Sequence, residues 1–335
     1  MFAAKHPVLI YAEGGIGDNL LAYPALKALE ESFPDCVSFV CQPGIGPVLA
    51  SGLSLRGVHE LAVRWTSLQA DATTPEVLAQ NNYHFEVSER VSFDAETLAQ
   101  RIGRCDLLVS LNVWHSQSME DLLRLLKPSL SIGAASAFDV ALPTTYHVRP
   151  HAAECHFAAV RQVGIPRRLD DFELPPFISQ CREKAGGLGL IPPHTKAVAL
   201  HMDTAAFRMW PIERWNALLR RFLERHQDFV AVVVGIQRLD LNCGPYQHRI
   251  LRGTGLDMET SFGLVALCDL FVGIDSCMLH LADLSRIPGV GLFGPSDCAV
   301  WGFRFSKHRH VSGCGTMDAI TVDSVEEAME SLLSA

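Results

Sequence analysis

The sequence predicts an α/β fold made of two doubly wound domains, each with a parallel sheet between layers of helices. One observation is that short apolar runs alternate with amphipathic helical patterns, with glycine turns between them, which is typical of parallel strands joined by helical crossovers. A second is that a passage rich in Pro and charged residues, 162–180, interrupts this alternation, which then restarts. A chain of 335 residues is long enough for two domains that each have a core.

The first half is expected to form an N-terminal domain over residues 1–165. Its apolar runs predict strands at 8–12, 36–41, 57–63 and 105–111, and its helical patterns predict helices at 19–32, 47–52 and 119–127. Residues 65–104 are polar and less regular, so we expect a loop-rich excursion near a site. Residues 166–180 are expected to be the linker to the next domain.

The second half is expected to form a C-terminal domain over residues 181–315. Its patterns predict strands at 196–202, 229–235, 270–275 and 289–295 and helices at 212–226, 261–269 and 278–286. Residues 316–335 end in a helix that we expect to pack back across the base of a cleft between the domains. Ligands of open α/β sheets bind at the carboxyl ends of the strands, so this cleft is the expected site.

Composition and charge exclude several classes of protein. The net charge of −9 disfavours a nucleic-acid partner, which would need a basic surface. No apolar run reaches the roughly 20 residues of a membrane span, and the first residues lack the order of a signal peptide. We therefore expect a cytoplasmic protein without a transmembrane segment, and contact with a membrane surface stays open. The ten cysteines include no C-x-x-C pair, so we expect buried, reduced thiols and no metal site.

A glycine-rich turn follows the first predicted strand. Gly15-x-Gly17-x-x-Leu20 approaches the dinucleotide fingerprint, but Cys41 and Gln42 stand where a ribose-binding carboxylate belongs at the end of the second strand. This disfavours an NAD-dependent oxidoreductase, and no cofactor is expected. Asp18 lies where the helix begins, so it is either a helix cap or a general base aimed at an acceptor hydroxyl. Glu13, at the end of the strand, is a second candidate for that base.

Three strand ends of the second half carry polar residues that suit a nucleoside diphosphate. Asp275, Ser276 and His280 surround a strand-to-helix turn, where free backbone N–H groups favour phosphate. The other two strand ends are followed by Thr204 and Arg208 in one case and by Gly294, Pro295 and Ser296 in the other. His280 alone, on an apolar helix, is more simply explained as a core residue.

The motifs together resemble a known family. "GGIGDNLLAYPALKALEESFPD", "ALHMDTAAFRMWPIERWNALLRRF" and "DLFVGIDSCMLHLADLSRIPGVGLFGPSDCAVWG" are similar in order and spacing to segments of glycosyltransferase family 9, the ADP-heptose:lipopolysaccharide heptosyltransferases. The resemblance implies a GT-B fold of two Rossmann-like domains facing a cleft. It also implies that the first domain binds the acceptor, that the second binds a nucleotide sugar, and that inverting transfer needs no metal. ADP-heptose is the favoured donor.

The resemblance also implies roles for single residues. Asp18 would be the catalytic base, with Glu13, Gly15 and Gly17 on the acceptor side. The donor diphosphate and sugar would contact Asp203, Thr204, Arg208, Asp275, Ser276, Cys277, Met278 and His280, and the nucleotide would contact Gly235, Gln237, Gly294, Pro295 and Ser296. Arg208 stands at the family's lysine position. Asp203 and Cys277 depart from the pattern, and Gln237 or Asp240 replaces the glutamate that holds the ribose.

The charged residues in the first half of the chain indicate which kind of acceptor the protein would bind. Residues 65–140 contain five basic and ten acidic residues, which suits a neutral or cationic acceptor better than anionic lipopolysaccharide. One alternative is therefore transfer of another sugar to a small natural-product or amine-bearing molecule. A non-catalytic relative that binds sugar nucleotides is the alternative from another class.

Overall fold

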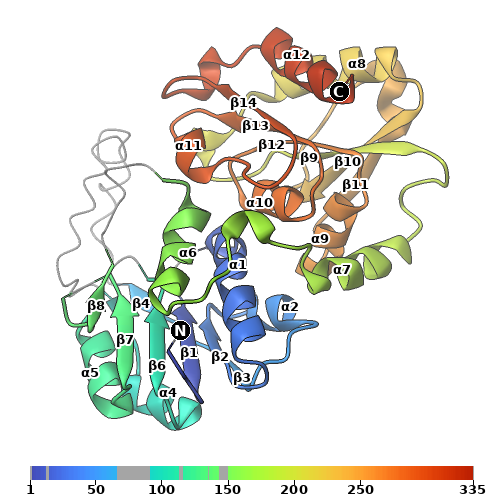
Figure 1. Ribbon diagram of the computed structural model, residues 1–335. Helices are drawn as coiled ribbons and strands as arrows, with labels where there is room; N and C mark the ends of the chain where they lie inside the picture. Colours follow the sequence, from blue (N-terminus) through green and yellow to red (C-terminus); the bar gives the residue numbers. More distant parts are fainter. Residues whose placement is uncertain are drawn as a thin grey trace. The chain divides into compact units, whose positions relative to one another are not determined.

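The computed structural model describes residues 2–12, 15–65, 91–112, 116–134, 136–142 and 150–334. Glu13 and most of the segment predicted as a loop-rich excursion lie outside these residues. The chain divides into two compact units, residues 1–172 and 173–335 (Figure 1). Each unit has its own sheet of six parallel strands flanked by helices, so the predicted fold class of two doubly wound α/β units is confirmed.

The sheet of the first unit has the order β3-β2-β1-β6-β7-β8. Its strands are β1 (Pro7–Tyr11), β2 (Ser38–Cys41), β3 (Gly57–Glu60), β6 (Leu107–Ser110), β7 (Leu130–Gly133) and β8 (Val140–Ala141). The short strands β4 (Arg64–Trp65) and β5 (Val91–Ser92) form a separate antiparallel pair. The four predicted strands are present, and β7 and β8 extend the sheet beyond them.

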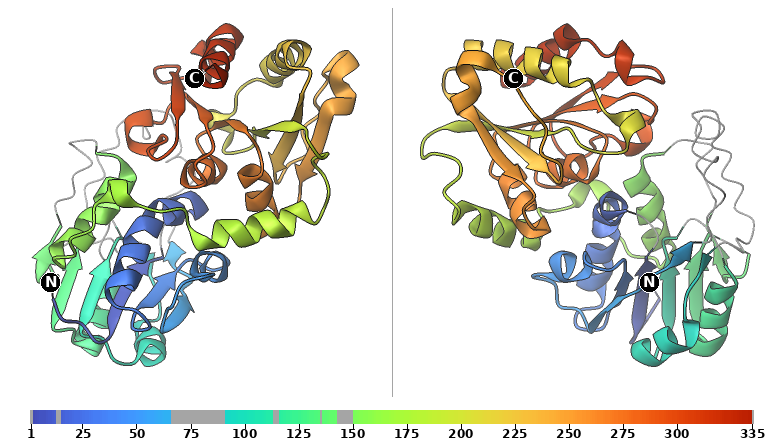
Figure 2. Two further views of the ribbon diagram at one scale, coloured as in Figure 1. Left: turned by 45° about the vertical axis from the view of Figure 1, so that its right-hand side comes forward. Right: turned by 180° about the vertical axis from the view of Figure 1, so that it is seen from behind.

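Two pairs of helices cover this sheet. The helices of the unit are α1 (Ile16–Ser32), α2 (Gly46–Ala50), α4 (Ala95–Ile102), α5 (Gln117–Leu126) and α6 (Ala152–Gln162), followed by a 3-10 turn at Leu169–Asp171. Helix α1 packs beside α6, and α4 packs beside α5 (Figure 2). Buried side chains of β1, α4 and α5, among them Val8, Leu98 and Leu122, form one core of the unit.

The sheet of the second unit has the order β11-β10-β9-β12-β13-β14. Its strands are β9 (Lys196–His201), β10 (Phe229–Gly235), β11 (Ile250–Thr254), β12 (Leu270–Ile274), β13 (Gly289–Phe293) and β14 (His308–Ser312). The chain runs from β9 outward to β11 and then returns to β12, on the other side of β9. This reversal of direction beside β9 is where doubly wound sheets bind ligands.

The helices of the second unit cover both faces of its sheet (Figure 1). They are α7 (Pro176–Gly186), α8 (Ile212–Arg225), α9 (Met258–Ala266), α10 (Cys277–Leu284), α11 (Cys298–Trp301) and α12 (Val322–Leu333), with 3-10 turns at Ala206–Arg208, Gly244–Arg249 and Met317–Ala319. Helix α7 begins inside the segment expected as a linker. It packs on α9 so closely that a Cβ at Gly263 would lie 1.9 Å from the carbonyl oxygen of Cys181.

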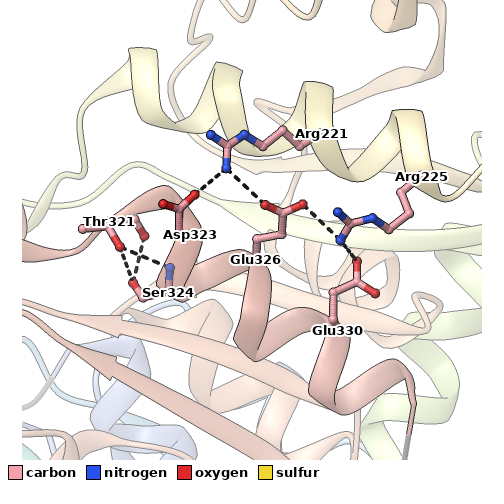
Figure 3. Close-up of polar contacts among 7 residues, drawn as sticks. All are labelled: Arg221, Arg225, Thr321, Asp323, Ser324, Glu326 and Glu330. Carbon is pink, nitrogen blue, oxygen red and sulfur yellow. Dashed lines mark hydrogen bonds and ion pairs between the residues drawn. The ribbon is translucent and has the colours of Figure 1, made fainter.

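The C-terminal helix α12 packs on α8 of the same unit. Val325 and Met329 are fully buried in the core that α8 and the sheet share. At the surface, Arg221 pairs with Asp323 and Glu326, and Arg225 pairs with Glu326 and Glu330 (Figure 3). Thr321 caps the helix by accepting a hydrogen bond from the Ser324 amide.

The remaining sequence expectations concern membranes and thiols. Within the described ranges, no helix is long and apolar enough to cross a lipid bilayer. All ten cysteines are free thiols. Only half of them are buried, because Cys36, Cys155, Cys277 and Cys298 are partly exposed and Cys314 is exposed, so the expectation of uniformly buried thiols is wrong.

Candidate functional site

The candidate site of the second unit lies at the carboxyl edge of its sheet. Parallel strands β10, β9 and β12 are neighbours in that order, so their carboxyl ends meet at one edge. His201 is the last residue of β9, Gly235 is the last residue of β10, and Asp275 follows β12 directly. The apolar runs before these residues make buried strands, and the polar residues begin where each strand leaves the core.

A chain of polar contacts runs across the three strand ends. The Nδ1 atom of His201 lies 2.8 Å from Oγ of Ser276, and its Nε2 atom lies 3.0 Å from Oδ1 of Asp203. The side chains of His201 and Asp203 are each only 7% exposed. The imidazole therefore lies between a carboxylate and a hydroxyl. It shares a hydrogen bond with the hydroxyl, whereas Oδ1 of Asp203 is buried without a hydrogen-bond partner in the described chain.

The second carboxylate oxygen of Asp203 is hydrogen-bonded to the backbone. Its Oδ2 accepts hydrogen bonds from the amides of Ile236 and Gln237, both at 2.7 Å. Burial raises the pKa of Asp203, but the contact with His201 and the two amides outweigh burial and hold that pKa below 3.8. The carboxylate is thus an anion at neutral pH, and its charge is directed toward the loop after β10. The family resemblance implies that a diphosphate binds near Asp203. The two amide hydrogen bonds stabilise the negative charge of the Asp203 carboxylate at this position.

A second cluster pairs a cation with a buried acid. The Nη1 atom of Arg208 lies 3.1 Å from Oδ2 of Asp275, and Nε2 of His280 lies 3.9 Å from Oδ1 of the same carboxylate. Asp275 and His280 are almost fully buried, whereas the Arg208 side chain is 36% exposed. The Nε atom of Arg208 is buried and makes no hydrogen bond within the described chain. It is therefore an unsatisfied hydrogen-bond donor.

The start of helix α10 lies beside both clusters. Ser276 is the N-cap residue, in extended conformation, and its side chain bonds His201 and makes no cap hydrogen bond. The positive end of the helix dipole and the first-turn amides favour an anion here. Burial raises the pKa of Cys277 to about 11, so this thiol stays neutral at pH 7. Met278 is 7% exposed and packs inward.

The other predicted donor residues lie at the same edge or just beyond it. Thr204 is partly exposed and follows Asp203 directly, and Gln237 is exposed after β10. Gly294, Pro295 and Ser296 follow β13, on the far side of β12 from β9. Gly294 contacts the segment after β14, because a Cβ there would lie 2.7 Å from the amide nitrogen of Met317 and its carbonyl accepts from Gly315.

In the first unit, Asp18 occupies the first turn of α1. The helix begins at Ile16, three residues earlier than predicted, with Gly15 as its N-cap and Gly17 inside the first turn. The Asp18 Oδ2 atom accepts a hydrogen bond of 2.6 Å from the Gly15 amide. Asp18 is therefore a helix cap, and because its side chain is only partly buried, the cap role does not conflict with a role at a substrate.

Sequence reasoning missed His201, which joins two of the predicted residues. Its position in the sequence could have indicated it, because His201 is the polar residue that ends the buried apolar run of β9. The contacts of Asp203 with the backbone amides of Ile236 and Gln237 could not be predicted, because every residue except proline has such an amide. Among the described residues, no group of three or more His, Cys, Asp and Glu side chains is arranged to hold a metal ion.

Comparison with known proteins gives a family match over part of the chain, and a fold. The profile of glycosyltransferase family 9 (heptosyltransferase) matches residues 180–326. A family 9 glycosyltransferase from Veillonella parvula DSM 2008 has a similar structure, with a TM-score of 0.71 at 15% identity, covering 98% of this chain and 97% of that one. No curated protein matches the sequence.

Two further structures are from E. coli. ADP-heptose lps heptosyltransferase II has a TM-score of 0.67 at 14% identity, covering 98% of both chains. Heptosyltransferase WaaC with ADP has a TM-score of 0.65 at 14% identity, covering 97% of this chain and 99% of that one. At these identities, the similar structures establish only the fold. The match to the family profile supports the family resemblance that the sequence motifs indicate.

Proposed function

We propose the reaction of this glycosyltransferase, whose residues 180–326 match the profile of glycosyltransferase family 9. The protein transfers a sugar from a nucleoside diphosphate donor to an acceptor hydroxyl, with inversion and without a metal ion. ADP-heptose is the favoured donor, supported by the family match and by the likeness to a heptosyltransferase structure with ADP.

The observation that carries this proposal is the Arg208–Asp275 pair beside the start of α10. Asp275 holds the guanidinium at 3.1 Å, while the buried Nε donor of Arg208 has no partner in the described chain. The amides that begin α10 add further donors at the same place. A fixed cation and preorganised amides stabilise the charge that develops on a leaving diphosphate, which is the task of a divalent ion in other enzymes.

The proposed chemistry is one displacement. The acceptor oxygen forms a bond to the anomeric carbon as the bond from that carbon to the diphosphate oxygen breaks. Asp18 takes the proton of the acceptor hydroxyl, and the diphosphate leaves with the electron pair toward Arg208 and the α10 amides. The Gly15 amide donates a hydrogen bond to Asp18 and so fixes the orientation of the carboxylate, as a general base requires. Attack opposite the leaving group inverts the anomeric centre.

The acceptor proposal has two candidates. One is lipopolysaccharide, which the name of the structurally similar ADP-heptose lps heptosyltransferase II supports. The other is a small neutral or amine-bearing molecule, supported by the excess of acidic over basic residues in the segment 65–140. A transfer assay with an anionic glycan and with an amine-bearing glycan separates them, and turnover of the anionic glycan alone rejects the second.

A thermal-shift screen tests the donor. ADP, GDP, UDP, dTDP and NAD are each added at about 1 mM, and a ligand at a hundredfold excess over its Kd stabilises the folded protein by about 2.7 kcal/mol. We expect a selective rise in Tm with ADP. A rise with another diphosphate keeps the fold and reaction class but replaces the donor. A rise with NAD alone contradicts the proposal, and binding without transfer to any acceptor supports the non-catalytic relative.

A further inference from the structure

The loop after β9, which carries Arg208, is anchored at both of its ends. At its start, the Asp203 carboxylate accepts hydrogen bonds from two amides of the loop after β10. At its end, Trp210 is buried, and its Nε1 atom donates a hydrogen bond of 3.0 Å to the carbonyl of Ile320. The 3-10 turn Ala206–Arg208 lies between these anchors. The backbone at Arg208 is therefore held in place, and the freedom that remains is that of its long side chain.

Phe207 belongs to the same turn, and its ring contacts Arg208. Phe207 is 43% exposed, which is unusually open for an aromatic residue whose value to a fold is the large apolar area that it buries. The Cζ atom of Arg208 lies over this ring, 5.3 Å from its centroid. A guanidinium at this distance from an aromatic face is attracted to it by a cation–π interaction. The ring of Phe207 thus serves the arginine more than the core.

The guanidinium of Arg208 is held from two directions. Its Nη1 atom lies 3.1 Å from Oδ2 of Asp275, which fixes one corner of the planar group. This contact alone leaves the plane free to turn about the corner, whereas the ring of Phe207 restricts the plane itself. A long side chain that is ordered before the ligand arrives costs the complex less affinity than one that the ligand must order.

We propose that Phe207 is a positioning residue for the donor diphosphate, because it holds the Arg208 guanidinium in the orientation that binds this group. The inference rests on the proposed function, in which Arg208 is the cation of the donor site. Phe207 acts through Arg208 and need not touch the diphosphate. An arginine stacks on an aromatic face through its planar group, which the ammonium of lysine lacks. The aromatic neighbour therefore suits the arginine that this chain has where the family resemblance implies a lysine.

Isothermal titration of the full chain with ADP, or with whichever diphosphate raises Tm in the thermal-shift screen, tests the role of the ring. Phe207→Leu keeps an apolar side chain but removes the aromatic face, and it should raise the Kd about three- to tenfold. Phe207→Tyr keeps the face and should bind within about twofold of the unmodified protein.

Phe305→Leu is the matched control for this substitution. The ring of Phe305 lies under Arg286, with Cζ 5.2 Å from its centroid. Arg286 precedes β13 and Phe305 precedes β14, so this pair lies at the amino edge of the sheet, opposite the donor site. The control removes the same kind of contact there and should leave the Kd for the diphosphate unchanged.

Two further readouts separate positioning from a merely structural effect. On the background of Arg208→Met, Phe207→Leu should change the Kd by less than about twofold, because no guanidinium is left to position. In the protein without ligand, the NMR order parameter of the Arg208 Nε–H group should lie near the value of about 0.85 for rigid backbone, and Phe207→Leu should lower it below about 0.6.

The failures of the two proposals are distinguishable. Tight binding of the diphosphate with the same Kd in Phe207→Leu overturns the inference and leaves the proposed function intact. An equal loss of affinity on the Arg208→Met background also overturns it, because the ring would then act independently of the arginine. If Phe207→Leu folds poorly, a low order parameter at Arg208 in the unmodified protein overturns the inference by itself. Absence of binding by every nucleoside diphosphate rejects the donor site and the inference with it.

Discussion

The carboxylate of Asp203 fills the space into which a side chain at Gly235 would project. A Cβ at Gly235 would lie 2.0 Å from Oδ1 of Asp203, and the φ angle of +137° at Gly235 is one that L residues rarely adopt. Glycine is therefore required at the end of β10, because the backbone there has this φ angle and because the Asp203 carboxylate occupies the space of a side chain. Asp203 in turn ties the end of β10 to His201 at the end of β9.

Gly235→Ala should destabilise the protein by about 2–4 kcal/mol, because it adds backbone strain and displaces the Asp203 carboxylate. Urea unfolding measures the loss. Gly244→Ala is the control, since Gly244 also has a positive φ, of +57°, but no heavy atom within 4 Å of its added Cβ. That change should cost only about 1 kcal/mol. Equal losses in the two variants would show that the contact with Asp203 contributes nothing.

Asp18→Asn separates the cap from the proposed base. The amide oxygen of asparagine still accepts from Gly15, so we expect a change in unfolding free energy of less than about 1 kcal/mol. The rate of sugar transfer should fall by about 10²–10⁴, because the proton acceptor is lost. Asp94→Asn is the matched control, since Asp94 caps α4 by accepting from Thr97. If both variants retain full transfer rates, Asp18 is a cap alone.

Arg208→Met should weaken nucleoside diphosphate binding by about 10- to 100-fold. It removes the donor that the diphosphate would meet and leaves Asp275 buried without its cation. Arg208→Lys should recover part of the affinity, since lysine keeps the charge but not the planar donor set. Arg252→Met, at an exposed arginine of β11, is the control for loss of a positive charge. Binding as tight in Arg208→Met as in this control would exclude Arg208 from the donor site.

The strands could be predicted where the sequence has continuous apolar runs. β9 and β10 are such runs, buried along nearly their whole length. β14 was missed because it is an edge strand, partly exposed along its length, with the sequence "HRHVS". Helix α7 was not predicted, because the prolines and charged residues around its start are typical of a linker. Proline is, however, compatible with the first turn of a helix, where Pro176 stands.

The candidate site was predictable as a set of strand ends but not as a network. Arg208 and Asp275 are 67 positions apart in the chain, and only the strand order brings them within 3.1 Å. The role of Asp203 was hidden for a different reason. Its partners are backbone amides of Ile236 and Gln237, which carry no residue-specific signal. The sequence shows that this acid departs from the family pattern, and the structure shows that two backbone amides hold its carboxylate.

The stability of the first unit should depend on pH through His156. Its ring is buried against Tyr11, with ring centroids 4.7 Å apart, and burial, with a smaller effect of His151, lowers the pKa of His156 to about 3. The unfolded chain binds this proton below about pH 6.5, but the folded chain does not. Stability is therefore full above pH 6.5 and falls as the pH drops toward 3, by up to about 1.4 kcal/mol per pH unit.

Hydrogen exchange of the β1 amides at pH 7 and pH 5, corrected for intrinsic rates, measures this dependence. His156→Asn should remove most of it while lowering stability at pH 7 through lost packing. A dependence that is unchanged in this variant would assign it to other groups.

The attachment of α12 to α8 should depend on apolar burial far more than on its ion pairs. Arg221 and Arg225 are about half exposed, and exposed pairs are worth at most about 1 kcal/mol because water and salt screen them. Arg221→Ala should therefore cost less than about 1 kcal/mol, and less still at high salt. Met329→Ala removes a fully buried side chain and should cost about 2–5 kcal/mol. Urea unfolding at low and high salt compares the two variants. A larger loss from Arg221→Ala would mean that the paired charges of Figure 3 act as a cooperative network.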